Sequence, residues 1–495
     1  MHRRLGVPDR PFPVSPAFNA SKIVAAVEFF LPRKKPMTYD LIVRGGTVVL
    51  PSTTITADVG IVGEKIASIG DLKEALAHRV FEAAGKLVLP GLVDPHVHLA
   101  DEEADKNAYA VDDFYTGTVA AAFGGNTTLL DFAPATPDHS ATTALQHRRR
   151  QTEGQAAVDF SHHVIVEQET PISLDTISQL PSHGTNTIKI FMFHPRMADD
   201  YALLQVIQTA AQNNLLVMVH AENHALLNGF QNATIAQGGT TIAHYPASQP
   251  PLLEIEAAQR AILLAEHTGA TLYIVHISCA ATVQLVRQAQ KRGCNVIGET
   301  VPHYLTLTEE VYASPNGTDY LCGPPIRTAA DSDALWQGLA DGTLTVVGSD
   351  HCGFSAAQKA WGQEDFRRGP KGIAGIETRA AVIYSEGVAK GRISLRQFVD
   401  VMSTNPARIF GLYPQKGALL PGSDADLCIF DPRVEWVVTH DGLHCGWGYT
   451  PHQGLKVTGK PVLTVLRGNV IVDGNRFDGQ PGGGRFLARN SFRKG

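Results

Sequence analysis

The chain has 495 residues, of which 44% are hydrophobic and 18% are charged, and its formal net charge is −6. These values are typical of a globular protein. No basic block is interleaved with aromatic residues, so a nucleic-acid partner is not expected. No apolar run reaches the roughly 18 residues of a membrane helix, and the six cysteines form no Cys-x-x-Cys pair. We therefore expect a cytoplasmic protein with reduced thiols and no membrane partner.

Residues 1–36 differ in composition from the rest of the chain. They contain seven lysines and arginines, two acidic residues and six prolines. Their only apolar stretch, residues 23–31, is interrupted by Glu28, which makes it a poor secretory signal. We expect residues 1–36 to form a poorly ordered extension, and a chain that begins at Met37 to fold and catalyse like the full chain.

Residues 37–90 predict a small β unit. Glycine turns separate five short segments with strand patterns: Leu41–Arg44, Thr47–Val49, Asp58–Val62, Lys65–Ile69 and Lys86–Leu89. Strand patterns return within residues 415–480, at Asp426–Phe430, Pro461–Arg467 and Val470–Val472. The simplest topology joins both parts in one β-sandwich domain. Residues 481–495 are glycine-rich and basic, and we expect this tail to be frayed or to contact a neighbouring subunit.

Residues 91–414 alternate between short β-rich segments and helical segments. Eight segments have strand patterns: the one that ends at His98, then Asn126–Phe132, Phe160–Val166, Thr187–Phe193, Leu215–His220, Thr271–Ser278, Asn295–Thr300 and Leu344–Asp350. Helical patterns lie between them, as at Ala202–Asn213 and Glu254–Thr268. Eight alternations within about 300 residues predict a parallel (β/α)8 TIM barrel. The expected fold class is therefore α/β, with the β-sandwich domain beside the barrel.

Metal-binding side chains stand at the carboxyl ends of several predicted strands. The first strand ends in His96 and His98, which an extended strand points to one face. The fifth ends in His220, the sixth carries His276 near its end, and the eighth ends in Asp350. Barrel enzymes keep their active sites at this end of the strands, so we expect one metal site there. Taken alone, Asp350 also fits a helix N-cap.

Other polar side chains near the strands have less specific positions. Four histidines lie in loops or at strand starts and are expected to be solvated or to lie behind the ligands: His162, His163, His183 and His224. Glu222 and His303 are near the barrel mouth and could orient ligands from behind.

Lys189 lies inside the fourth predicted strand. An uncompensated lysine in a buried strand is costly, so its pKa falls or an anion lies nearby. A neutral amine beside two cations can react with carbon dioxide to give a carbamate, an anion able to bridge two metal ions about 3.5–4 Å apart. A lysine that reaches past the strand end to solvent is the alternative. That alternative does not explain the coincidence with four histidines and Asp350.

These motifs together resemble the amidohydrolase superfamily, and more closely its hydantoinase/dihydropyrimidinase family of cyclic-amide hydrolases. The resemblance extends from Met37 to the C-terminal tail. The similar segments are Gly91–His98, Asp113–Thr118, Ala121–Thr128, Ile188–Met192, His220–Asn223, Gly298–Leu305, Gly323–Arg327, Gly348–His351 and Asn405–Leu412.

The resemblance implies an enzyme that opens a cyclic amide or ureide at a carbon–nitrogen bond other than a peptide bond. It implies two divalent metal ions per subunit, with zinc as the expected metal. His96, His98 and Asp350 would serve one ion, His220 and His276 the other, and carboxylated Lys189 both. A hydroxide that bridges the ions would attack the amide carbon, and Asp350 would be the catalytic residue that moves the proton. Similar enzymes form dimers and tetramers, so a homotetramer or homodimer is expected.

The substrate-binding positions depart from the family pattern. His194 stands where the family has a tyrosine that contacts the substrate carbonyl, and Lys371 stands where it has an asparagine. In similar enzymes the loop that corresponds to Cys322 and Gly323 holds the imide or ureide edge of the ring. The loop Ala100–Tyr109 is acidic where hydantoinases are usually hydrophobic. We therefore expect a substrate other than the usual hydantoin or dihydrouracil.

Two other functions stay open from the sequence. An allantoinase-like or other amidase with a more polar substrate is favoured by the acidic loop and by Lys371. A non-catalytic oligomeric interaction protein of the same fold would be marked by the loss of metal ligands, and no ligand position is lost.

Overall fold

The computed structural model describes residues 38–103, 106–135, 140–166, 171–193, 199–446 and 448–489. The predicted N-terminal extension and the position of His194 lie outside these ranges. Within them, no helix combines the length and the apolar character needed to cross a membrane.

Eight parallel strands form the predicted barrel. In sheet order they are β15 (Leu344–Val347), β14 (Val296–Thr300), β13 (Thr271–Ile274), β12 (Leu216–His220), β11 (Thr187–Phe191), β10 (Asp159–Val166), β9 (Asn126–Ala135) and β6 (Leu92–Val97). An isolated parallel bridge between Val97 and His351 brings the first strand next to the segment that follows the last. The predicted (β/α)8 fold is therefore confirmed, and its strands have nearly the predicted bounds.

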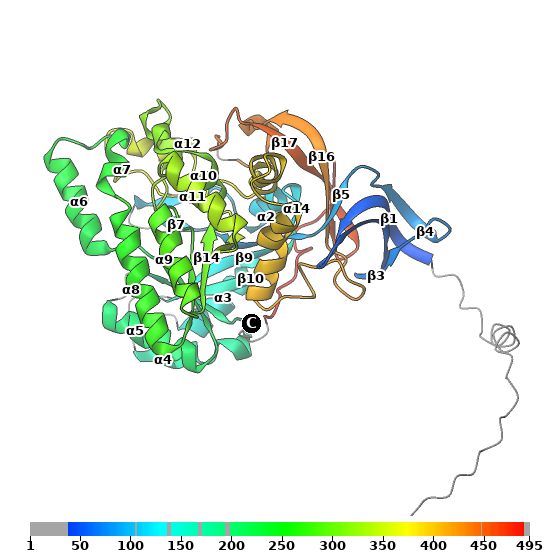
Figure 1. Ribbon diagram of the computed structural model, residues 1–495, viewed down its shortest axis with the longest axis horizontal. Coiled ribbons are helices and arrows are strands. Elements are labelled where there is room, and N and C mark those ends of the chain that lie inside the picture. Colours follow the sequence, from blue (N-terminus) through cyan, green and yellow to red (C-terminus); the bar gives the residue numbers. More distant parts are fainter. Residues whose placement is uncertain are drawn as a thin grey trace, which may run out of the picture.

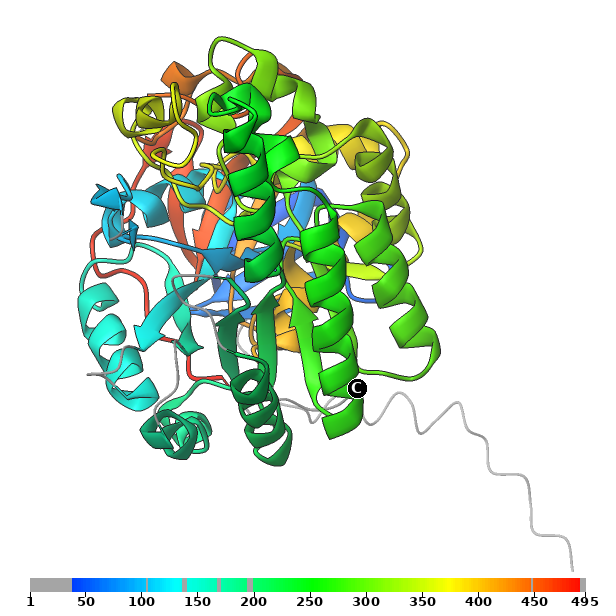
Figure 2. The same cartoon turned by 90° about the vertical axis from the view of Figure 1, so that its left-hand side faces the viewer.

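Helices follow the barrel strands and cover the barrel (Figures 1 and 2). They are α2 (Phe114–Phe123), α3 (Ala141–Thr152), α4 (Pro171–Ile177), α5 (Asp200–Gln212), α6 (His224–Ala236), α7 (Tyr245–Ser248), α8 (Leu252–Thr268), α9 (Ala280–Lys291), α10 (Pro302–Thr306), α11 (Ala329–Ala340), α12 (Ala356–Lys359), α13 (Arg379–Ile383), α14 (Leu395–Val399) and α15 (Asn405–Ile409). Polar side chains begin several of them: Asp113 caps α2 and Thr328 caps α11, each in a capping box.

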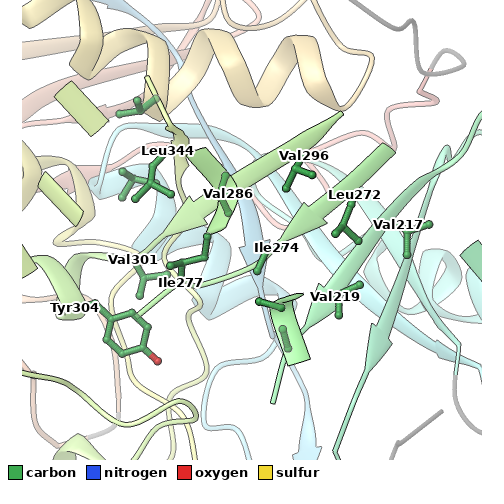
Figure 3. Close-up of a cluster of buried hydrophobic side chains, with 14 of the residues drawn as sticks. Val217, Val219, Leu272, Ile274, Ile277, Val286, Val296, Val301, Tyr304 and Leu344 are labelled. Atoms are coloured by element: carbon green, nitrogen blue, oxygen red, sulfur yellow. The ribbon is translucent and has the colours of Figure 1, made fainter. Parts of the chain in front are cut away.

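The strands alternate their side chains between the barrel interior and the helices. On β12, Val217 and Val219 pack toward the helices together with Ile274 of β13 and Val286 of α9 (Figure 3). Met218, between the two valines, belongs to the cluster inside the barrel. This period of two leaves His220 at the open carboxyl end of its strand, where the metal site was expected.

The two ends of the chain build a second domain, as predicted. Its strands are β1 (Thr38–Val49), β2 (Thr54–Val62), β3 (Lys65–Gly70), β4 (Leu76–Glu82), β5 (Leu87–Pro90), β16 (Leu427–Val437), β17 (Lys456–Leu466), β18 (Asn469–Asp473) and β19 (Arg476–Phe477). Hydrogen bonds join all nine in one sheet, in which β16 of the C-terminal segment pairs with β5 of the N-terminal segment. Figure 1 shows this β domain beside the barrel.

Two strand features escaped the sequence prediction. The two predicted segments 41–44 and 47–49 form the single strand β1, because the bulge between Val43 and Gly46 bends the strand without ending it. The strand β4 was not predicted, because its side chains are mostly exposed and give no alternating apolar pattern. A two-stranded hairpin, β7 (Glu102–Glu103) and β8 (Ala108–Tyr109), lies within the acidic loop after the histidine pair.

The C-terminal tail docks on its own barrel as far as Arg489. The Phe160 N–H donates to the carbonyl oxygen of Arg485, the Leu487 N–H donates to that of Phe160, and the Arg489 N–H donates to that of Gly184. For residues 481–489 the expectation of a frayed tail is therefore wrong, and contact with a neighbouring subunit stays a prediction. Residues 490–495 lie outside the described ranges.

A buried ion cluster ties the barrel to the β domain. The Lys416 ammonium lies 2.6 Å from Asp159, which begins β10, and 2.6 Å from Asp426, which precedes β16. It also lies 3.0 Å from Asp424, and its side chain is only 1% exposed. One buried lysine thus contacts three buried carboxylates at the junction of the two domains; Asp159 also pairs with Arg467, and Asp424 also pairs with Lys65.

Replacing Lys416 by methionine is expected to lower the free energy of unfolding by about 3–5 kcal/mol, because the buried carboxylates lose their counter-ion. Denaturant unfolding measures the effect. The matched control is Lys73→Met, which breaks the exposed pair with Asp71 and should cost less than about 1 kcal/mol. Equal effects of the two substitutions would contradict this account of the junction.

Candidate active site

One cavity of about 660 Å³ opens at the carboxyl ends of the barrel strands. All six predicted metal-binding side chains line it: His96, His98, Lys189, His220, His276 and Asp350. Phe191, Phe193 and Phe354 form an apolar part of the wall, and the acidic loop Asp101–Glu103 forms a polar part. Three strands and three of the segments that follow strands thus bring the predicted side chains to one place.

The first group of candidate ligands comprises His96, His98 and Asp350. One nitrogen or oxygen atom from each lies within 4.8 Å of the others. An oxygen of Asp350 lies 3.1 Å from Nε2 of His96 and 3.6 Å from Nε2 of His98. Within the described part of the chain, Nε2 of His96 is buried without a hydrogen-bond partner. These atoms have the types and the spacing needed to hold one divalent cation.

Carboxylates fix both imidazoles of this pair from behind. Nδ1 of His96 lies 2.7 Å from Glu299, and Nδ1 of His98 lies 3.0 Å from Asp101. Burial lowers the pKa of His96, but Glu299 and Asp350 outweigh it and raise the pKa to about 9. Burial raises the pKa of Asp350, but His96 outweighs it and holds the pKa well below its ordinary value. The negative charge of the carboxylates around His96 and His98 therefore favours the binding of a cation.

The second group comprises His220 and His276. Nδ1 of His220 lies 2.9 Å from Nε2 of His276, and Nε2 of His220 lies 2.7 Å from Glu222. Burial lowers the pKa of both imidazoles well below the ordinary value. Both rings are therefore neutral near pH 7, with nitrogen lone pairs available to a metal ion. The prediction that Glu222 would lie behind a ligand agrees with this contact.

Lys189 lies between the two groups. It is 1% exposed, and its Nζ lies 5.2 Å from the ring centroids of Phe132 and Phe191. Burial lowers the pKa of its amine to about 8, although Asp350 and Glu299 oppose the shift. Among the described residues, Lys189 has no hydrogen-bond or ion-pair partner. The alternative in which this lysine reaches solvent is therefore wrong.

Two of these residues have strained backbones. The φ angles of His276 and Asp350 are +36° and +50°, in the left-handed region that non-glycine residues rarely adopt. Such strain persists where the surrounding structure fixes the conformation, as at functional sites. Asp350 is not a helix cap, because the next helix, α12, takes Ser355 as its N-cap.

Three of the four predicted substrate-binding residues lie on the cavity wall: Cys322, Gly323 and Lys371. The carbonyl oxygen of Cys322 accepts a 2.6 Å hydrogen bond from the hydroxyl of Tyr245, which takes one of its two lone pairs. The Gly323 peptide has no hydrogen-bond partner in the described ranges. The fourth residue, His194, lies outside these ranges, and the structure does not describe it.

Sequence reasoning missed Glu299 of β14, one of the three barrel strands, the second, third and seventh, in which no ligand was expected. It is fully buried and binds Nδ1 of His96, the N–H of His276 (3.0 Å) and the hydroxyl of Tyr273 (2.7 Å). A charged residue within an apolar strand was the available signal, the same signal that identified Lys189. Its partners lie too far along the chain to be found from sequence spacing.

The remaining predicted histidines do not join the metal groups. His162 lies 3.6 Å from Asp131, and His163 binds the hydroxyl of Thr187 at 2.6 Å. Burial lowers the pKa of His303 to about 4. No hydrogen bond or ion pair in the described ranges connects His303 to a candidate ligand, so its expected role of orienting a ligand finds no support.

Comparisons with known proteins agree with this geometry. Residues 87–471 match the amidohydrolase family. The D-hydantoinase of Ralstonia pickettii is 39% identical over 460 residues, covering 92% of this chain and 100% of that protein. The D-hydantoinase of Geobacillus stearothermophilus is 38% identical over 460 residues, covering 91% of this chain and 97% of that protein. The crystal structure of dihydropyrimidinase from Brevibacillus agri NCHU1002 superposes with a TM-score of 0.89 and 38% identity, covering 92% of this chain and 99% of that one.

Replacing Glu299 by glutamine is expected to weaken the binding of divalent metal ions by about 10–100-fold, because the carboxylate that orients His96 loses its charge. Competition with a chelator of known affinity measures the change. Glu309→Gln is the control, since Glu309 is an exposed glutamate away from the cavity. Unchanged affinity in Glu299→Gln would remove this carboxylate from the metal site.

Proposed function

The chain belongs to the amidohydrolase family, and within it to the hydantoinases, and on this basis we propose that it opens cyclic amides or ureides that carry an anionic group. Family membership makes it a metal-dependent hydrolase of carbon–nitrogen bonds other than peptide bonds. The observation that carries the substrate proposal is the lysine ammonium of Lys371, which lies on the wall of the same cavity as the candidate metal ligands.

We propose that the family's two metal ions are zinc. His96, His98 and Asp350 would hold one ion, His220 and His276 the other, and Lys189 would hold both as a carbamate. The support for the carbamate is a buried amine without a partner between two groups of ligands. Its neutral form adds to carbon dioxide and loses a proton, which leaves an anionic ligand. When bound, two such cations lower the pKa of a water molecule and polarise a carbonyl oxygen.

Asp350 is the proposed proton carrier. Its side chain is 17% exposed and faces the cavity, and its low pKa keeps it ionised near neutral pH. It would accept the proton of the attacking water and donate it to the departing ring nitrogen. Phe191 and Phe193 would limit the access of other water molecules.

Gly323 is the proposed contact for the ring edge. Its N–H and C=O are both unpaired in the described ranges, while the preceding carbonyl is occupied by Tyr245. One residue with a free donor and a free acceptor matches the alternating C=O and N–H groups of a cyclic ureide. The backbone of Cys322 stays a second proposed contact, because its carbonyl oxygen can accept one more hydrogen bond.

Lys371 is the proposed contact for the anionic group. Its Nζ donates one hydrogen bond, to Gln249 at 3.2 Å, and forms no ion pair with a described residue. An ammonium has three donors, so two stay available to a carboxylate of the substrate. Lys371 lines the cavity, which supports its role as a substrate contact.

A second candidate is an allantoinase-like or other amidase for a more polar, uncharged substrate. The carboxylates of Asp101, Glu102 and Glu103 on the cavity wall favour it, because they accept hydrogen bonds from ureido N–H groups. Metal-loaded protein assayed on hydantoins, dihydropyrimidines and allantoin, each with and without a carboxylate, separates the two candidates.

We also propose a homotetramer or homodimer in the cytoplasm, as the family resemblance implies. Exposed apolar side chains on the neighbouring helices α5 and α8 support an assembly: Tyr201 is 68% exposed and Leu263 is 64% exposed.

Replacing Lys371 by asparagine is expected to lower kcat/KM for a carboxylate-bearing hydantoin by about 10–100-fold, because a charged contact is lost. The value for the neutral ring of the same size should change less than about threefold, since no charge faces it. Steady-state kinetics on the two substrates measure the ratio. Equal changes in kcat/KM for both substrates, or a wild-type enzyme that prefers the neutral ring, would contradict the proposal that the substrate is anionic.

Replacing Asp350 by asparagine is expected to lower kcat by about two to four orders of magnitude, because an amide neither carries the proton nor binds a metal ion with the same charge. Circular dichroism should show an intact fold, since the side chain faces the cavity. Turnover close to that of the wild type would exclude Asp350 from proton transfer.

A further inference from the structure

The side chain of Gln249 lies between the positive charge of Lys371 and the negative charge of Glu222. Its Oε1 accepts from Nζ of Lys371 at 3.2 Å, and its Nε2 donates to Oε1 of Glu222 at 2.6 Å. Gln249 is 1% exposed, as is Glu222. An ammonium only donates and a carboxylate only accepts, so both partners fix the same orientation of the amide.

This contact continues to the candidate metal ligands. The other oxygen of Glu222 binds Nε2 of His220 at 2.7 Å, and Nδ1 of that ring faces His276 at 2.9 Å. The backbone of Gln249 is also held, because its carbonyl oxygen accepts from Nη1 of Arg327 at 2.6 Å. A fixed series of hydrogen bonds therefore runs from the substrate wall to the second group of ligands.

Lys371 and Glu222 approach each other beside Gly323. A Cβ atom built on Gly323 would lie 3.6 Å from Cδ of Lys371 and 3.8 Å from Oε2 of Glu222. Opposite charges this close in a cavity wall attract strongly, and a direct ion pair would neutralise both. It would also draw Glu222 away from His220. The neutral amide of Gln249 satisfies one donor of the lysine and one acceptor of the carboxylate without adding charge.

We propose that Gln249 is a positioning residue that keeps Lys371 available to the anionic group of the substrate by separating it from Glu222. The proposal rests on the function proposed above and deepens it, because it assigns the selectivity for an anion to a residue behind the cavity wall. Gln249 itself acts through Lys371 and does not contact the reacting atoms.

Two substitutions of similar size test the proposal: Gln249→Glu, which supplies a carboxylate to Lys371, and Gln249→Met, which removes both hydrogen bonds. In each, KM for a carboxylate-bearing hydantoin should rise about tenfold, because the ammonium pairs within the protein. Any effect that reaches the metal ligands through Glu222 lowers kcat/KM for the neutral ring of equal size by the same factor, so the ratio of the two kcat/KM values isolates the effect on Lys371. The preference for the anionic substrate should therefore fall about tenfold in both variants. Gln284→Met, on the exposed face of α9, is the control for the substitution itself.

The outcomes separate this proposal from the one on which it rests. If Lys371→Asn lowers the preference and both Gln249 variants keep it, the role of Gln249 is wrong and the anionic substrate stands. A fall in kcat on both substrates, with an unchanged ratio of the two kcat/KM values, also overturns the proposal. That result indicates that Gln249 supports Glu222 and does not act on Lys371. If Lys371→Asn leaves the preference unchanged, the substrate proposal fails first. Thermal unfolding of each variant shows that the fold is intact, and the two Gln249 variants provide independent tests.

Discussion

The architecture of the site follows from one electrostatic constraint: the four imidazoles, the amine and the carboxylate that could hold metal ions lie together in one cavity. Buried groups of this kind are stable in a protein interior only when they are neutral or when a positive charge lies beside them. Burial keeps His220 and His276 neutral, whereas carboxylates raise the pKa of His96 to about 9. The cavity therefore has the electrostatic character of a cation site, and its ligands need rigid support.

Carboxylates behind the ligands provide that support. Glu299 fixes His96 and the backbone of His276, Asp101 fixes His98, and Glu222 fixes His220. Glu222 also binds Gln249, which in turn binds Lys371. The residues that would orient a metal ion and those that would select a substrate thus share one hydrogen-bonded network.

Much of this arrangement could be predicted from the sequence, because the barrel places the ends of parallel strands at one edge. His96, His220 and Asp350 each close an apolar strand, and all three face the cavity as expected. The contacts behind them could not be predicted, since Glu299 meets His96 across 203 residues of chain. Hydrogen bonds to the backbone could not be predicted either: the hydroxyl of Tyr245 donates to the carbonyl oxygen of Cys322 across 77 residues of chain. The tail looked unattached because glycine-rich segments give no pattern, although backbone hydrogen bonds dock it on β10.

The central claim is that two metal ions meet at a carboxylated Lys189, and a crystal structure of the metal-loaded protein tests it most directly. The account predicts forked density extending from Nζ of Lys189 between two metal ions, with His96, His98 and Asp350 around one ion and His220 and His276 around the other. A bare amine at Lys189 beside bound metal, or a single ion held without this lysine, would contradict it.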